Sequence, residues 1–154
     1  MSLALDDVEP AAREVLLEEL AEFTAVQGNP ATQARYAALV EAVDQGVIPD
    51  ELVPPLEVFL ELVLSGGRLR KERGAEADTA LSGLFFKTPT GAAARAAAHA
   101  VTRALGQLGG QLLQRVTITA GVIGHTVTIE TERSQVVVEL DRGGARVKSL
   151  EVGA

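Results

Sequence analysis

One stretch of the chain places a histidine and two arginines at regular spacing. Arg95, His99 and Arg103 follow one another at steps of four residues within an alanine-rich run. On a helix this spacing puts the three side chains on one face, where the two cations would disfavour the protonated imidazole. A neutral imidazole between arginines could serve an anionic substrate. Solvated helix faces also commonly carry these residue types, so we expect a solvated face and keep the three residues as functional candidates.

Nucleophilic catalysis finds little support elsewhere in the chain. The other histidine, His125, follows Gly124 at the expected start of a strand, and no serine lies in a G-x-S-x-G motif. The chain has no cysteine, which excludes thiolate catalysis and thiolate zinc sites. We therefore favour a protein that is not an enzyme and predict no catalytic residue. Replacing His99 or His125 should leave the native activity intact.

Metal and cofactor sites are no better supported. Glu57 and Glu61 lie one helical turn apart, and three more glutamates repeat at that spacing, Glu14, Glu18 and Glu22. Di-iron bundles combine such glutamates with Glu-x-x-His motifs, but neither histidine lies three residues after a glutamate. The segments SGGRLRKERG and DRGGAR match neither of the glycine-rich phosphate-binding patterns. We predict no metal and no cofactor, and interpret the glutamates as solvated helix faces.

A basic run is the strongest candidate for an anion or partner contact. Four cations gather within six residues, Arg68, Arg70, Lys71 and Arg73. Nucleic-acid binding through residues 68–73 would need several phosphate contacts, and the expected exposed sheet face offers no aromatic side chains for stacking on bases. Because the chain is acidic overall, with a net charge of −7, we do not expect nucleic acid as a partner.

The charges divide unevenly along the chain. Residues 1–65 hold 13 acidic side chains and two basic ones, whereas residues 66–154 hold 12 basic and eight acidic ones. Such an asymmetry marks either a partner surface or two halves that face each other in the fold. We favour the second interpretation, in which the basic run contacts acidic side chains of the first 65 residues.

The composition is that of a folded protein of ordinary domain size. The chain has 154 residues, of which 47% are hydrophobic and 23% charged. We expect one domain, 1–154, with a possible subdivision into a helical region 1–87 and a helix-plus-sheet region 88–154. No signal peptide or membrane span is expected. Arginine outnumbers lysine 11 to 3, as in GC-rich bacteria, so we expect a cytoplasmic bacterial protein.

Apolar periodicity and capping signals predict five helices. Their expected positions are from about Asp7 to before Gly28, from Pro30 to before Gly46, 54–64, 75–86 and 89–112. The helix 54–64 is apolar on nearly every side, which predicts burial in the domain or in an oligomer interface. Thr88 should cap the last helix, whose many alanines allow close approach to a neighbouring element.

Alternation with period two then predicts four strands, at about 115–120, 125–131, 135–140 and 145–151, with a bulge near Ser149. Short turns between them indicate an antiparallel β-meander with one face on the core and one face exposed. The fold class is therefore α+β, with amino-terminal helices followed by a long alanine-rich helix packed on the meander.

These features favour a non-enzymatic protein-interaction or assembly domain. The apolar helix and the two unpaired edges of the meander predict a homodimer or higher oligomer, with protein or self as the partner. Two alternatives remain open. One is a nucleic-acid-binding protein that uses the basic run 68–73, and the other is a small-ligand-binding or enzyme domain with a pocket between helix 89–112 and the sheet.

Overall fold

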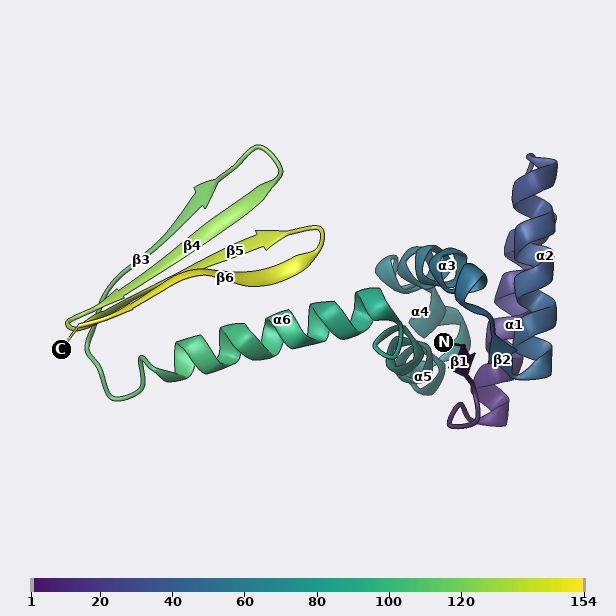
Figure 1. Cartoon of the computed structure of the whole chain (residues 1–154), viewed down its shortest axis with the longest axis horizontal. Coiled ribbons are helices and arrows are strands. Elements are labelled where there is room, and N and C mark those ends of the chain that lie inside the picture. The colour runs from purple at the N-terminus through teal and green to yellow at the C-terminus, as the bar shows by residue number, and fades with distance from the viewer. Residues whose placement is uncertain (1, 154) are drawn as a thin grey trace. The chain divides into compact units, whose positions relative to one another are not determined.

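A computed structural model describes residues 2–153 and confirms the α+β class (Figure 1). The chain forms two compact units, residues 1–91 and 92–154. The first is helical, and the second holds most of the last helix and a four-stranded sheet. A single domain over 1–154, or a division after residue 87, stays a prediction. Among the residues described, no helix has the length and apolarity needed to cross a lipid bilayer.

The helical unit opens with the antiparallel pair α1 (Pro10–Ala25) and α2 (Pro30–Gln45). As predicted, Asn29 caps α2, because its side-chain oxygen accepts hydrogen bonds from the backbone N–H groups of Ala31 and Thr32, at 2.9 and 3.1 Å. The predicted start of the first helix near Asp7 is wrong. A proline keeps the residue before it extended, so Glu9 precedes a helix that begins only at Pro10.

Two short strands form a small sheet that the sequence analysis missed. β1 (Leu3–Ala4) pairs antiparallel with β2 (Val47–Ile48). β2 begins directly after Gly46, which ends α2 in the left-handed conformation with a φ of 83°. Segments of two residues are too short to show an alternating pattern. They nevertheless bury Ile48 completely and draw the amino-terminal segment onto the helices.

The apolar helix is α3 (Val53–Ser65), which follows a 3₁₀ turn, η1 (Asp50–Leu52). Phe59, Leu60 and their neighbours on one side are buried, but Val58 and Leu62 remain about half exposed. The prediction that this helix is buried on nearly every side is therefore wrong for Val58 and Leu62. The basic run forms a short helix, α4 (Arg68–Arg73), that the pattern did not indicate, and α5 (Ala75–Phe85) confirms the helix expected at 75–86.

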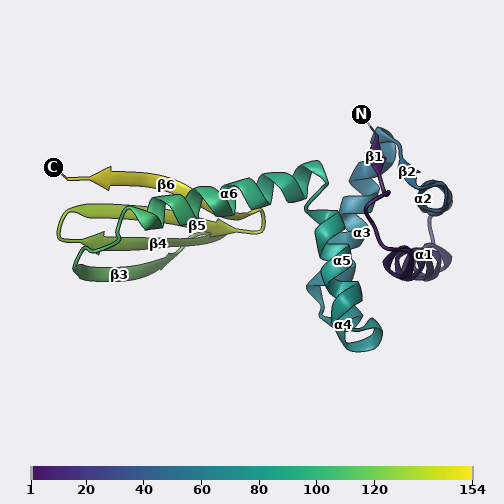
Figure 2. The ribbon, with the colours of Figure 1, turned by 90° about the horizontal axis from the view of Figure 1, so that it is seen from below.

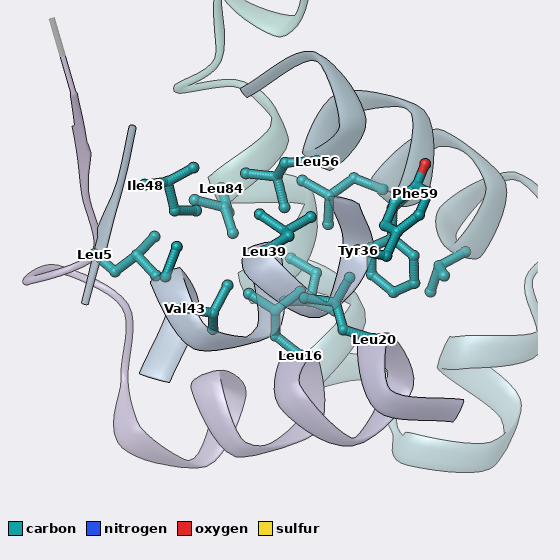
Figure 3. Close-up of a cluster of buried hydrophobic side chains, with 14 of the residues drawn as sticks. Leu5, Leu16, Leu20, Tyr36, Leu39, Val43, Ile48, Leu56, Phe59 and Leu84 are labelled. Carbon is teal, nitrogen blue, oxygen red and sulfur yellow. The ribbon is translucent and has the colours of Figure 1, made fainter. Parts of the chain in front are cut away.

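The core of the helical unit is mainly aliphatic (Figure 3). Leu16 and Leu20 of α1 meet Leu39 of α2, and all three are fully buried. Three of the five aromatic rings cluster here: the centroid of Phe23 lies 4.8 Å from that of Tyr36 and 5.4 Å from that of Phe59, both edge-on. Edge-to-face contacts of this kind add to the energy of burial.

The last helix, α6 (Pro89–Gly106), begins where predicted but ends six residues early. The Thr88 hydroxyl accepts a hydrogen bond from the Gly91 backbone N–H at 3.2 Å, which confirms Thr88 as the cap. The prediction that the helix reaches Leu112 is wrong. Three glycines interrupt that stretch, at 106, 109 and 110, and Gly110 adopts a φ of 73°, which is outside the helical region.

The sheet confirms the predicted meander, with each strand within two residues of its expected bounds. Its order is β3-β4-β5-β6, all neighbours antiparallel, with β3 (Leu113–Ala120), β4 (Gly124–Thr131), β5 (Ser134–Asp141) and β6 (Gly144–Val152). The bulge is also confirmed. Val138 pairs with Val147 and Val137 pairs with Ser149, which leaves Lys148 as the extra residue of β6.

Helix α6 covers only part of the sheet (Figure 2). Ala104 is buried against Val136 and Val138 of β5, and partly buried residues of β4 and β6 complete the contact. A helix is about 10 Å wide and strands lie about 4.8 Å apart, so one helix cannot shield four strands. One face of the meander was predicted to pack on the core, and the contact with α6 agrees with this for β4, β5 and β6. On β3, Val116 and Ile118 are 51% and 68% exposed.

Candidate functional site

The basic run lies against the acidic face of α1. Arg68 donates a hydrogen bond to Glu19 and another to Glu72, the latter at 2.6 Å. Arg73 reaches three carboxylates: its Nε lies 3.1 Å from Glu19, and its terminal nitrogens lie 2.8 Å from Glu18 and 3.6 Å from Glu22. Two guanidinium groups therefore converge on one glutamate.

Glu19 is the buried centre of this cluster, with a side chain that is 2% exposed. A buried carboxylate needs such partners, because its desolvation is otherwise uncompensated. The hydrogen bonds with Glu19 are also the main cause that raises the pKa of Arg68 and that of Arg73, so both guanidinium groups stay charged. The arrangement holds α4 on α1 by electrostatics.

The other two cations of the run are placed differently. Arg70 and Lys71 are exposed and have no charged partner within residues 2–153. Two cations of the run, Arg70 and Lys71, therefore face solvent, whereas the other two, Arg68 and Arg73, bind carboxylates of the same chain. Nucleic-acid binding through residues 68–73 stays a prediction.

The histidine and arginine constellation lies on α6. Arg95, His99 and Arg103 are all exposed there, and the residues that meet the sheet, such as Val101 and Ala104, occupy other positions of the helix. The side chains that fill the contact between α6 and the sheet are apolar. A ligand pocket at that contact and a role for the three α6 residues stay predictions.

His125 lies at the far end of the sheet, in an open hollow between two turns. The hollow is lined by the turn that joins β3 to β4, which carries Val122 and Ile123, and by residues 140–143, where β5 ends and turns into β6. Arg146 also borders it, engaged by Asp141 and lying 3.8 Å from Glu139. The hollow is lined by both apolar and charged side chains. No serine among the described residues lines it, so His125 has no serine nucleophile beside it there.

The most exposed apolar surface of the sheet unit follows β3 and its two ends. We call it the β3 surface, and define it by six side chains that are all more than half exposed, Leu112, Leu113, Val116, Ile118, Val122 and Ile123. Every residue of β3 is exposed. Large apolar side chains that are exposed along one strand in this way are typical of interaction surfaces.

The same strand leaves backbone groups unpaired. The backbone N–H of Gly121 donates to the oxygen of Gly124 at 2.7 Å, and the pairing with β4 is regular back to Arg115. In an antiparallel pair, hydrogen-bonded and non-hydrogen-bonded positions alternate. Thr117 and Thr119 therefore direct their N–H and C=O groups to β4. The residues that direct these groups to the open edge are Val116, Ile118 and Ala120.

Sequence reasoning did not identify this site, although the alternating strand at 115–120 and the two unpaired edges of the meander were predicted. The sequence does not reveal which strands α6 covers, because that depends on how the helix lies on the sheet.

Comparison of the chain with models of protein families, with curated proteins and with solved structures found no match. The function is therefore inferred from the geometry of each of the two units.

Proposed function

We propose that this chain is a non-enzymatic protein-interaction or assembly module of the bacterial cytosol, and that it binds a second protein chain through the β3 surface. One observation carries the proposal: β3 combines an uncovered apolar strip with an unpaired backbone edge. An added strand would satisfy the backbone groups, and its side chains would extend the apolar face.

The opposite edge of the sheet supports this choice. β6 carries the bulge at Lys148, together with the charges of Arg146 and Glu151. Bulges and charged side chains are the usual means by which proteins protect an edge strand from pairing. β3 also has a register irregularity, at Gln114 near its start, but its pairing is regular from Arg115 to Ala120, and Arg115 is its single charged residue. This regular stretch is the part of the β3 edge that is open to pairing, and it carries fewer charges than the β6 edge.

The proposal is tested by a photo-crosslinking amino acid placed at Ile118 of the full chain, in cells of its natural host. Val152, an exposed apolar residue at the end of β6, provides the matched control. We expect illumination to yield a discrete crosslinked product from position 118 and none from position 152, with the crosslinked chain identified by mass spectrometry.

The absence of any product from position 118, or the same products from both positions, would contradict the proposal. In that case the next candidates for a functional site would be the exposed residues of α6, Arg95, His99 and Arg103, and the exposed cations of α4, Arg70 and Lys71.

A further inference from the structure

We infer that the occupant of the β3 surface is the β3 strand of a second copy of this chain, paired antiparallel about a two-fold axis at Thr117. The inference rests on the proposed function and specifies its partner. It follows from symmetry, from the register that symmetry allows, and from the charge and area of the surface.

Symmetry restricts how two β3 strands can join. In a continuous antiparallel sheet the two-fold axis is perpendicular to the sheet, so each residue and its symmetry mate lie on the same face. Side chains on one face alternate with those on the other, and facing residues share a face. The axis must therefore pass at a residue that sits opposite itself, and not between two residues.

Among the central residues of β3, Thr117 is the best site for that axis. It places Val116 of each copy opposite Ile118 of the other, and these are the residues whose N–H and C=O groups point to the open edge. Each of these two pairs then exchanges two backbone hydrogen bonds. An axis at Val116 would instead put Ile118 opposite the polar Gln114.

The polar face of the junction agrees with the same register. Thr117 lies opposite Thr117 of the second copy, and facing threonines are a favourable cross-strand pair. Arg115 lies opposite Thr119, so that no two like charges face each other. Within its own chain, Arg115 also has Glu130 of β4 at 3.6 Å.

Charge does not oppose the union of two sheet units. Residues 92–154 carry seven basic and five acidic side chains, a net charge of +2, whereas residues 1–91 carry 16 acidic and seven basic ones. The nearly neutral unit is thus the one that bears the apolar strip. Self-association through the helical unit would bring together two surfaces of like sign.

The exposed apolar area also favours the pairing. The six side chains of the β3 surface are 51% to 103% exposed, and their flanks leave water together with the edge backbone when two β3 strands pair. The two-fold pairing uses the β3 edge of both copies, and the bulged and charged β6 edges disfavour further pairing, so the assembly closes as a dimer.

A single cysteine tests the register in the full chain, because the natural sequence has none. Thr117 would occupy a non-hydrogen-bonded pair with itself, where the two Cα atoms lie about 4.5 Å apart, within the range for a disulfide. We expect Thr117→Cys to form a covalent dimer under mild oxidation. Non-reducing gel electrophoresis measures the dimer, and circular dichroism checks that the variant is folded.

Thr119→Cys is the matched control, since Thr119 is an exposed threonine on the same strand and the same face. Its symmetry mate would lie about 13 Å away along the strand, beyond disulfide reach, so we expect roughly tenfold less covalent dimer. Equal crosslinking of both variants would overturn the register at Thr117.

Light scattering of the unsubstituted chain separates this inference from the proposed function. A dimer in solution that Thr117→Cys fails to crosslink would overturn the β3 pairing and leave assembly in place through another surface. A monomer at high concentration would overturn self-pairing. Crosslinking from position 118 to a different protein would then leave the interaction function standing with another partner.

Discussion

Glu19 shows how one buried charge organises the helical unit. Its sequence context, between Glu18 and Leu20 in a glutamate-rich helix, resembles that of its solvated neighbours, and the spacing of the glutamates predicted a solvated face. That prediction missed Glu19 because it lies beside the ladder of Glu14, Glu18 and Glu22. Burial of Glu19 depends on α4, a helix that the apolar pattern did not reveal.

Removing both arginines should destabilise the chain, because Glu19 would remain buried without its cations. We expect Arg68→Ala combined with Arg73→Ala to lower the free energy of unfolding by about 3 kcal/mol, as measured by urea denaturation followed by circular dichroism. Replacing Glu19 by Met in that double variant should recover most of the loss, since the uncompensated charge is then gone.

The paired control uses the other two cations of the same run. Arg70→Ala combined with Lys71→Ala should change stability by no more than about 0.5 kcal/mol, because both side chains are exposed. Equal losses in the two double variants would show that Glu19 does not depend on Arg68 and Arg73.

Side chains of α3 and of the segment between α5 and α6 hold the start of α6 in place. Thr88 is fully buried and donates a hydrogen bond to the Phe85 carbonyl at 2.7 Å. Glu57 of α3 accepts from the Thr90 backbone N–H at 2.8 Å and from its hydroxyl at 2.9 Å. Glu57 was interpreted as part of a solvated face, whereas its carboxylate in fact caps α6, where the helix dipole favours a negative charge.

Gly91 allows this close approach, and its replacement should be costly. A Cβ atom at Gly91 would lie 1.9 Å from the Phe85 carbonyl oxygen, so the backbone would have to move. We expect Gly91→Ala to lower the free energy of unfolding by about 3 kcal/mol, measured by urea denaturation.

Gly83 in α5 provides the comparison. An added Cβ there meets nothing within 4 Å, so Gly83→Ala should stabilise the chain by roughly 0.5–1 kcal/mol. If Gly91→Ala were as stable as Gly83→Ala, the tight joint between α5 and α6 would be contradicted.

Local signals predicted the elements well, and tertiary context decided the rest. Asn29, Thr88 and the alternating strands act through neighbours in sequence, so caps, meander and bulge could be read directly. The exposure of β3 depends on which strands the single helix α6 covers. That is a property of long-range packing, which the local pattern does not indicate.

The position along the chain where the charge changes sign differs from the boundary between the two units. The change of sign falls after residue 65, whereas the first unit extends to residue 91. Arg68 and Arg73 meet acidic side chains of α1, and Lys87 lies 3.1 Å from Asp7, all inside the helical unit. Much of the asymmetry is thus internal to one unit, and the sheet unit is left nearly neutral.

The central claim is that β3 is the edge at which two chains join, and residue-resolved amide hydrogen exchange tests it most directly. The backbone N–H of Ile118 points to the open edge, whereas those of Thr117 and Thr119 bond to β4. With increasing protein concentration, we expect exchange at Ile118 to slow until it matches its two neighbours. Leu150, whose N–H faces the outer edge of β6, should continue to exchange rapidly. Rapid exchange at Ile118 at every concentration would contradict the claim.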